Sequence, residues 1–435
     1  MTPFTDLAQA IAWVFDLQKF GIKFGLSSTL DLLARLGIPY QQGRYLHIAG
    51  TNGKGSVGAM LSAVLTRAGY PVGLFTSPHL VDFRERFRLK DQEISAARVL
   101  SLINQVRLVT DEREPPTFFE FVTAMALLYY YQEQADPIIL ETGLGGRLDA
   151  TNIVSPWVTV ITNIDHDHHE HLGSDLLQIA AEKAGIIKPA APLVTYATQK
   201  SVLELFRRRC QELAAPLYQG GVDFKTRGRG GGWFDYHGLE HDFKGLRLNL
   251  RGRHQYRNAA LALAVLEILA RQGLDLSETA IREGLPKTYW PGRLEQVAQD
   301  SRVILDGAHN PAAAQSLAQA LKRSRGNSRL ILVLGVMADK DVDGILARLL
   351  PLAQLVIFTQ PRYFRAAATA DLLRRAEAYG LPALSVPVVA DAIQQAQSLA
   401  RPHDRILISG SLFTVGEAKQ YFAPAASVTA QPVRG

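Results

Sequence analysis

The glycine-rich segment at residues 50–56, which reads GTNGKGS, constrains the fold of this chain more than any other stretch. An apolar run at residues 45–49 predicts a strand before it, and a helical pattern at residues 57–68 follows. Glycines let the backbone turn tightly and direct N–H groups at a phosphate, and a helix start adds partial positive charge. The spacing departs from G-x-x-x-x-G-K-S/T because a glycine separates Lys54 from Ser56. We therefore predict a variant phosphate-binding loop, in which Lys54 reaches the β- and γ-phosphates and Ser56 binds phosphate or magnesium.

Short apolar runs alternate with helical patterns on either side of this loop. Strands are predicted at residues 72–76, 137–141 and 157–162, and an apolar helix at residues 118–132. Such alternation is typical of an α/β fold, in which a parallel sheet carries helices on both faces. Ligands of these folds sit at the carboxyl ends of the strands, and the polar motifs of this chain fall there.

The second half of the chain suggests a change of domain. Residues 220–250 read as a small antiparallel excursion, and residues 255–272 as a long helix. Proline and glycine at residues 286–295 predict a hinge, after which strands at 303–305, 330–335, 355–359 and 406–409 alternate with helices. We predict an N-terminal ATP-binding domain at residues 1–292, a smaller α/β domain at 296–424 and a disordered tail at 425–435.

Composition limits the classes of partner and compartment. The 435 residues, 47% of them hydrophobic, are enough to bury a large core, and a net charge of +6 suits anionic small molecules. Nucleic-acid binding is not expected from so mild an excess. No apolar window long enough for a membrane span occurs, and residues 1–17 do not read as a signal peptide. A single cysteine, Cys210, favours the reducing cytoplasm.

A motif at residues 141–152, ETGLGGRLDATN, predicts a metal-binding carboxylate. Glu141 ends a predicted strand beside the phosphate loop, and magnesium prefers oxygen ligands. Ser77, which directly follows the neighbouring predicted strand, is expected to face the nucleotide. Arg147 and Asp149 are expected to line a cleft from the loop that follows.

The histidine-rich run at residues 165–171, DHDHHEH, has two readings. Its density resembles a transition-metal site, yet no cysteine or distant histidine completes a tetrahedral set. Its place after a strand beside the phosphate loop fits a second magnesium ligand better. We select His168, and we expect manganese to substitute for magnesium.

Polar loops also follow the strands predicted in the second domain. DGAHNP at residues 306–311, GVMADKD at 335–341 and GSLFTVGE at 410–417 share one position in the strand–turn–helix pattern. Three such loops at one sheet edge predict a ligand cleft. Asp306 and His309 are expected to project from the top of this sheet.

Taken together, these motifs resemble those of the folylpolyglutamate synthase and dihydrofolate synthase family, relatives of the Mur ligases, from about residue 20 to residue 420. The resemblance implies a P-loop NTPase-like domain with a parallel sheet, followed by a smaller Rossmann-like domain. It implies that ATP is bound by Thr51, Asn52, Gly53, Lys54, Gly55, Ser56, Asn258, Arg293 and Asp306. It implies magnesium ligands at Ser77, Glu141 and His168, and catalytic roles for Lys54, for His309 and for Lys183 as a carbamate. The substrate-binding residues that we expect are Phe24, Gly25, Leu26, Ser27, Phe118, Phe119, Glu120, Arg147, Asp149 and Ser411.

The activity implied by this resemblance is an ATP-dependent ligation through an acyl phosphate. Dihydropteroate or tetrahydrofolate supplies the carboxylate and L-glutamate the amine, and His309 is the candidate base. Asp165 and His166 stand where the family has a small and a hydrophobic residue, which bears on the choice of metal-binding histidine. Folylpolyglutamate synthase activity alone, or another Mur-type ligase, is the alternative, and a P-loop ATPase switch is a reading of a different class. We expect a monomer, and a requirement for a monovalent cation stays open.

Overall fold

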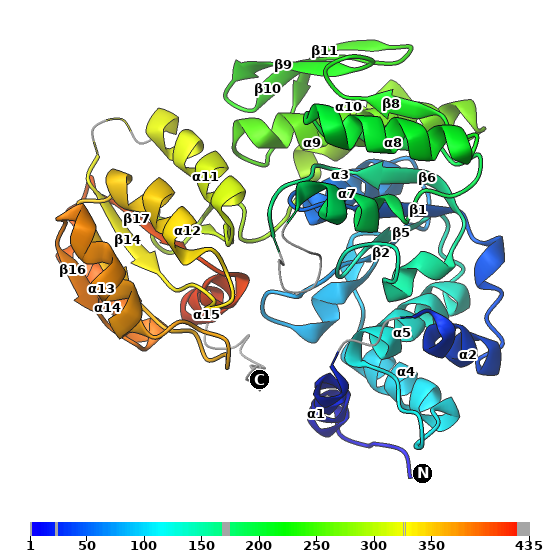
Figure 1. Ribbon diagram of the computed structural model, residues 1–435, viewed down its shortest axis with the longest axis horizontal. Helices are drawn as coiled ribbons and strands as arrows, with labels where there is room; N and C mark the ends of the chain where they lie inside the picture. The colour runs from blue at the N-terminus through cyan, green and yellow to red at the C-terminus, as the bar shows by residue number, and fades with distance from the viewer. Residues whose placement is uncertain (1, 22–24, 168–174, 325, 327, 424–435) are drawn as a thin grey trace.

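The computed structural model describes residues 2–21, 25–167, 175–324, 326 and 328–423. Figure 1 shows two lobes side by side, and we call the elements from α1 to α10 the first lobe and those from β12 to α15 the second lobe. The α/β fold class is confirmed, because each lobe is built on a largely parallel sheet. The predicted tail at residues 425–435 lies outside the described residues, and the domain boundaries at 292 and 296 stay a prediction.

An eight-stranded sheet forms the centre of the first lobe, in the order β4-β3-β2-β5-β1-β6-β7-β8. The six strands from β2 to β8 in that order are parallel, and β3 and β4 continue the sheet antiparallel at one edge. Strand β1 therefore has neighbours on both sides, and the loops after β5, β1 and β6 meet at one edge. The strands are β1 Tyr45–Ala49, β2 Gly73–Phe75, β3 Phe87–Leu89, β4 Gln92–Glu93, β5 Ile138–Glu141, β6 Pro156–Ile161, β7 Leu193–Thr195 and β8 Leu217–Gln219.

Helices cover both faces of this sheet and bury it. One face packs on α3, α9 and α10, and the other packs on α1, α2, α4 and α5, while α7 and α8 cover the end of the sheet near β7. All eleven residues from Gly55 to Leu65 of α3 are buried, which makes α3 a central helix. The helices are α1 Leu7–Asp16, α2 Ser27–Arg35, α3 Lys54–Arg67, α4 Ala96–Val109, α5 Phe118–Gln132, α7 Leu176–Ala184, α8 Lys200–Glu212, α9 Arg253–Arg271 and α10 Glu278–Gly284.

The predicted antiparallel excursion forms a separate three-stranded sheet in the order β11-β10-β9. Its strands are β9 Lys225–Gly230, β10 Trp233–His237 and β11 Asp242–Arg247, and they lie over α9 at the top of the view in Figure 1. The carboxylate of Glu267 on α9 accepts hydrogen bonds from Leu239 N, Glu240 N, His241 N and the Tyr236 hydroxyl. This buried acceptor fixes the β10–β11 turn to the first lobe.

A six-stranded sheet in the order β12-β13-β17-β14-β15-β16 forms the second lobe. All strands but β12 run parallel, with α11, α12 and α13 on one face and α14 and α15 on the other. The strands are β12 Glu295–Gln296, β13 Val303–Asp306, β14 Leu330–Leu334, β15 Leu355–Phe358, β16 Ala383–Ser385 and β17 Arg405–Ser409. The helices are α11 Pro311–Ser324, α12 Val342–Leu349, α13 Thr369–Ala376, α14 Val389–Leu399 and α15 Leu412–Phe422.

The connection between the lobes is anchored to both of them. Trp290 packs against α3, and the Arg88 guanidinium lies 5.4 Å from its ring. Glu295 accepts hydrogen bonds from Lys419 Nζ at 2.6 Å and from Gly292 N at 2.7 Å. None of the described helices combines the length and the apolar character needed to cross a bilayer.

Candidate active site between the two lobes

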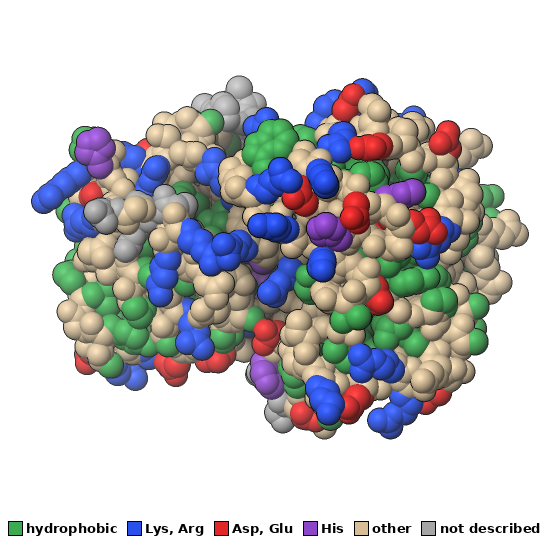
Figure 2. All heavy atoms as spheres, turned by 90° about the horizontal axis from the view of Figure 1, so that it is seen from above, with side chains coloured by type: hydrophobic (Ala, Val, Ile, Leu, Met, Phe, Trp, Pro, Cys, Tyr) green, Lys and Arg blue, Asp and Glu red, His purple; other side chains and the backbone are tan. Residues whose placement is uncertain are grey.

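A cavity of about 610 Å³ lies between the lobes, where the carboxyl ends of both parallel sheets meet. Seen from above in Figure 2, lysine and arginine side chains gather near the middle of the face, over the junction of the lobes. The predicted phosphate loop and the polar loops of the second lobe both line this cavity. It is lined by Thr51, Asn52, Gly53, Lys54, Gly55, Ser56, Asn258, Arg293 and Asp306, the nine residues expected to bind ATP.

The phosphate loop owes its shape to two glycines. A Cβ at Gly50 would lie 1.9 Å from Thr162 Oγ1, and one at Gly53 would lie 2.7 Å from Asn258 Oδ1. Both residues also have positive φ, of 141° and 91°, which disfavours any residue with a side chain. Helix α3 begins at Lys54 rather than at the predicted residue 57, so Lys54, Gly55 and Ser56 form its first turn. This places the positive end of the helix inside the loop.

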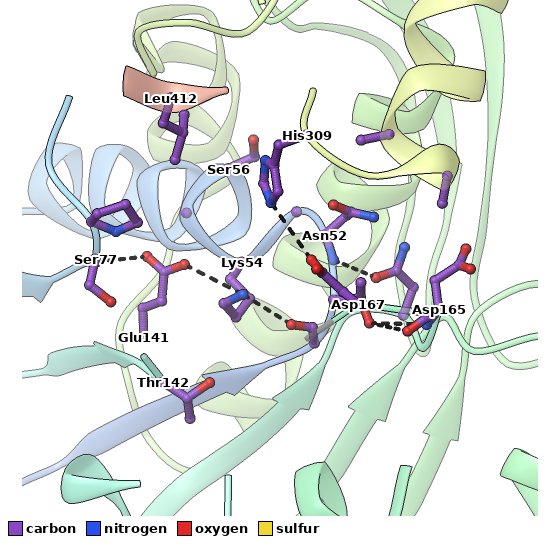
Figure 3. A pocket seen from close by; sticks show the side chains of 18 of the residues that line it. Asn52, Lys54, Ser56, Ser77, Glu141, Thr142, Asp165, Asp167, His309 and Leu412 are labelled. Atoms are coloured by element: carbon purple, nitrogen blue, oxygen red, sulfur yellow. Dashed lines mark hydrogen bonds and ion pairs between the residues drawn. The ribbon is translucent and has the colours of Figure 1, made fainter. Parts of the chain in front are cut away.

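Lys54 and Glu141 face each other across the floor of the cavity, as Figure 3 shows. Lys54 Nζ donates to the Gly50 carbonyl at 3.0 Å and lies 4.0 Å from Glu141 Oε1. The Ser77 backbone N–H donates to Glu141 Oε2 at 3.4 Å. Burial raises the pKa of Glu141 to about 6, against the opposing effect of the nearby Lys54 ammonium. A buried carboxylate with one long cationic contact is a group whose charge a bound cation would stabilise.

These residues fit a divalent metal. Glu141 and Ser77 both line the cavity beside the phosphate loop and offer oxygen atoms, which magnesium and manganese prefer. The third predicted ligand, His168, lies outside the described residues. Within residues 2–21, 25–167 and the later described ranges, no group of three histidine, cysteine or acidic side chains forms a metal cluster.

Lys183 on α7 also lines the cavity, and its amine is buried. Burial lowers its pKa to about 7, with a further lowering by the Lys54 ammonium that the Asp167 and Asp149 carboxylates oppose. A substantial fraction of this amine is therefore uncharged at neutral pH. An uncharged amine is a nucleophile, whereas an ammonium is not.

Two of the second-lobe loops that line the same cavity follow β13 and β17. Asp306 ends β13, and its carboxylate accepts hydrogen bonds from Leu294 N at 2.9 Å and Ala308 N at 3.0 Å. His309 Nδ1 lies 2.8 Å from the Gly307 carbonyl, which assigns the ring proton to Nδ1 because a carbonyl only accepts. Ser411 caps α15 through its contact with Thr414 N at 3.0 Å. His309 and Ser411 line the cavity as predicted.

Several residues at the cavity were not predicted from the sequence. Arg86 is buried and donates from Nε to His79 Nδ1 at 2.8 Å, and burial lowers the pKa of His79 well below its usual value. Phe15 lines the cavity and stacks on Phe118, which was predicted but lies outside the lining, with ring centroids 5.3 Å apart; the two rings form an aromatic wall beside this pair. Asp167, Lys340, Tyr363 and Arg365 also line the cavity. The Ala-Asp-Lys-Asp run after a predicted strand was the available signal for Lys340, but only tertiary structure pairs it with Asp167.

The structure does not bring every predicted substrate residue to the cavity lining. Asp149 is buried and accepts hydrogen bonds from Gly143 N, Leu144 N and Thr151 N, so it shapes the loop after β5. Arg147 pairs with Glu182 at 2.8 Å. Glu120 completes a capping box at the start of α5. The predicted residues outside the lining are Gly25, Leu26, Ser27, Phe118, Phe119, Glu120, Arg147 and Asp149. Phe24 lies outside the described residues.

Comparison with known protein families identifies two matching regions. Residues 48–266 match the Mur ligase middle domain, and residues 292–412 match the Mur ligase, glutamate ligase domain.

Individual relatives match over nearly the whole chain. The dihydrofolate synthase/folylpolyglutamate synthase of Bacillus subtilis is 38% identical over 428 residues, which cover 96% of this chain and 99% of the relative. Escherichia coli FolC, solved in complex with DHPP and ADP, superposes with a TM-score of 0.88 at 34% identity and covers 97% of this chain and 98% of its own. The bifunctional folylpolyglutamate synthase/dihydrofolate synthase of Yersinia pestis, solved with AMPPNP and a Mn ion, gives a TM-score of 0.86 at 34% identity, with 97% and 99% covered.

Proposed function

This chain belongs to the dihydrofolate synthase/folylpolyglutamate synthase family of the Mur ligases, and from this premise we propose that it joins L-glutamate to a folate-type pterin acid with cleavage of ATP to ADP and phosphate. It makes dihydrofolate from dihydropteroate, and it extends tetrahydrofolate with further glutamates. The names of its relatives give both activities to those proteins. One observation carries the proposal: the phosphate loop, a buried carboxylate and the loops of the second lobe line a single cavity.

The first step of the reaction activates the acid. A carboxylate oxygen of the pterin acid attacks the γ-phosphorus of ATP, the bond to the ADP oxygen breaks, and an acyl phosphate forms. Lys54 stabilises the charge on the transferring phosphoryl group, which its position in the first turn of α3 supports. A divalent metal held by Glu141, Ser77 and His168 would supply further charge neutralisation when bound. The aromatic wall of Phe15 and Phe118 supports binding of a flat pterin ring nearby.

The second step forms the amide. The amine nitrogen of glutamate attacks the acyl carbon, a tetrahedral intermediate collapses, and the carbon–oxygen bond to phosphate breaks. The amine loses one proton, and His309 Nε2 is the acceptor that we propose. This choice is supported by the contact of Nδ1 with the Gly307 carbonyl, which leaves Nε2 free of its proton in the neutral ring.

We also propose that Lys183 is carbamylated. Its neutral amine attacks CO₂, the nitrogen loses a proton, and a carboxylate results. The pKa of about 7 supports this, because it leaves much of the amine unprotonated at neutral pH. The carbamate would place a negative charge beside the metal ligands, where an ammonium would repel the cation. An added mass of one CO₂, lost on acidification, is the expected observation for gently handled protein.

Oligomeric state and compartment complete the proposal. We propose a monomer, and we propose a location in the reducing cytoplasm, which the single cysteine, Cys210, supports. Size-exclusion chromatography with light scattering tests the monomer. Activity in potassium chloride compared with choline chloride tests the open question of a monovalent cation.

The decisive experiment measures phosphate release from ATP with dihydropteroate, with tetrahydrofolate, and with each acid plus glutamate. Release that requires both an acid and glutamate is expected, together with a glutamyl amide detected by mass spectrometry. If tetrahydrofolate plus glutamate supports release and dihydropteroate plus glutamate does not, the function is restricted to folylpolyglutamate synthase. ATP turnover that ignores both acid and glutamate would instead indicate an ATPase switch and overturn the proposal.

A further inference from the structure

A group of polar contacts crosses from one lobe to the other at the cavity. Asn310, which precedes α11 in the second lobe, donates from Nδ2 to Asp167 Oδ2 at 3.0 Å and to Asn52 Oδ1 at 3.1 Å. Its Oδ1 accepts from Asn52 Nδ2 at 3.3 Å, so the two amides pair reciprocally. Lys340 of the second lobe lies 2.6 Å from Asp167 Oδ1. His309, also in the second lobe, points toward Asp167 in Figure 3, and its Nε2 lies 3.7 Å from Asp167 Oδ2.

The first-lobe partners of these contacts are held in one braced unit. Asn52 lies in the phosphate loop, where its N–H donates to Asn163 Oδ1 at 2.8 Å and its carbonyl accepts from Thr162 Oγ1 at 2.6 Å. Thr51 Oγ1 accepts from Asp165 N at 3.0 Å, which ties the loop to the segment that contains Asp167. Because these bonds lie within the first lobe, Asn52 and Asp167 keep their places without the second lobe and offer it a fixed docking point.

The second-lobe partners are equally fixed. Asn310 Oδ1 also accepts from Ala313 N at 2.9 Å and so caps α11. Lys340 lies in the loop between β14 and α12, where its N–H donates to the Met337 carbonyl at 3.2 Å. Asn310 is 2% exposed and Asp167 is 7% exposed, so water competes little for these contacts. Buried contacts of a charged group are costly to break, because the charge is left without its partner.

We propose that Asn310, Lys340 and Asp167 form an interlobe clasp, with Asn310 as the positioning residue that sets the second lobe over the phosphate loop. The inference rests on the proposed function, because the clasp matters only if a group activated on one lobe meets an amine held on the other. Asn310 follows His309 directly, so the clasp also fixes the height of that histidine above the first lobe. A misplacement of about 1 Å between reacting groups costs on the order of 100-fold in rate.

The most informative variant is Asn310→Asp. An aspartate retains the oxygen that caps α11, so the helix start is preserved. It removes both donated hydrogen bonds and sets a carboxylate against Asp167, which turns attraction into repulsion. Asn249→Asp makes the same chemical change at an exposed position after β11 and serves as the matched control. Lys340→Met, with exposed Lys322→Met as its control, tests the second arm of the clasp.

Three measurements separate a clasp from a general structural role. Small-angle scattering with Mg-ADP should give a larger radius of gyration for Asn310→Asp than for the wild type. Positional isotope exchange in ATP reports acyl-phosphate formation without glutamate, and it should fall much less than glutamyl transfer. The rate of transfer at saturating acid and ATP should fall about 10- to 100-fold, and both controls should match the wild type.

The outcomes are distinct from those that test the function itself. If the wild type forms no glutamyl amide, the proposed function fails, whatever the variants do. If the wild type is active and Asn310→Asp keeps its transfer rate or its scattering profile, the clasp is refuted. Equal losses in isotope exchange and transfer would also refute it, because Asn310 would then act on phosphate chemistry.

Discussion

Burial acts in opposite directions on the two ionisable groups at the floor of the cavity. It raises the pKa of the Glu141 carboxyl to about 6 and lowers the pKa of the Lys183 amine to about 7. Both groups therefore lie close to a change of charge near neutral pH. What binds there would therefore set the charge of the site, since a bound cation would favour ionised Glu141 and the proposed carbamylation would consume neutral Lys183.

Replacement of Lys54 tests the phosphate loop at its central charge. Lys54→Ala should lower the rate of phosphate release by at least about 100-fold, because a positioned cation on a transferring phosphoryl group is lost. The measurement is glutamate-dependent phosphate release, with circular dichroism to show that the fold is kept. Lys322→Ala removes a lysine from the exposed side of α11 and should leave the rate unchanged. Activity of Lys54→Ala within a few-fold of the wild type would exclude the assigned role.

The Lys183 amine should leave a signature in stability. Its pKa is about 7 in the folded protein and 10.5 ordinarily, so between these values the unfolded chain binds more protons. Wild-type stability should therefore gain from this group as pH rises from 7 to 10, and the full cost of the buried charge is present below pH 7. Lys183→Met lacks this slope and should be more stable than the wild type by ~1–3 kcal/mol at pH 6.5. Urea denaturation of both proteins without CO₂ at pH 6.5 and pH 9 measures this difference in the free energy of unfolding. The same difference at both pH values would contradict the lowered pKa of Lys183.

At the scale of elements, helix α3 links the packing of the first lobe to its phosphate loop. Its N-terminal turn carries Lys54, while its later turns pack against α9 and α10. Helices α3 and α10 approach closely at Gly284, where a Cβ would lie 2.6 Å from the Cα of Val64. Backbone rather than a movable side chain occupies that space. A side chain at position 284 would therefore force the whole of α10 away from α3.

Two alanine substitutions separate backbone contact from side-chain contact in this region. Gly284→Ala should destabilise the protein by ~1–3 kcal/mol, because the added methyl forces the two helices apart. Gly58→Ala on α3 gains helix propensity, and its Cβ would meet only side-chain ends, at 3.1 Å from Leu74, 3.6 Å from Ile139 and 3.8 Å from Ile48. Its free energy of unfolding should stay within about 1 kcal/mol of the wild type. Denaturant titration compares the two, and equal losses would mean that the α3–α10 contact is not the limiting one.

The sequence could predict the strand ends that carry the site residues, because the residue types there are set by local backbone and side-chain chemistry. Glycines before Lys54, a carboxylate ending a strand at Glu141 and the Asp306 loop each mark a strand end within a few residues. The start of α3 was placed three residues too late, because a Lys-Gly-Ser run reads as loop although it forms the first helical turn. Asp149 resembled a cleft residue because an acid beside glycines suits ligand binding and loop bracing equally. Asp167 and Lys340 lie 173 residues apart, and no local pattern pairs them.

For the whole molecule, the cavity depends on two lobes that are joined at a short, well-anchored connection. The residues that we expect to bind the nucleotide are shared between them, with Lys54 and Asn258 on the first and Asp306 on the second, while Arg293 lies in the connection. A nucleotide bound there would contact both lobes, so its binding energy would also resist their separation.

Nucleotide binding should therefore stabilise the molecule as a whole and should depend on a divalent metal. At Mg-ADP about 100 times above its dissociation constant, the free energy of unfolding should rise by about 2.7 kcal/mol, with a single shifted transition. Removal of the metal with EDTA should abolish most of the shift, and manganese should restore it. Differential scanning calorimetry makes the comparison. A second transition that ignores the nucleotide would show that one lobe takes no part in binding.

Helix α3 packs in the core of the first lobe and also carries Lys54 at its first turn. Its residues from Gly55 to Leu65 are buried without interruption, so this stretch of the helix has no exposed side on which substitutions could accumulate harmlessly. In a library that varies every position, loss of ligase activity and loss of folded protein should coincide from Gly55 to Leu65, whereas they should separate at Lys54, Asn310 and His309. Directed evolution toward other amino acids or acids should then draw its changes from the rim of the cavity and leave this helix as it is.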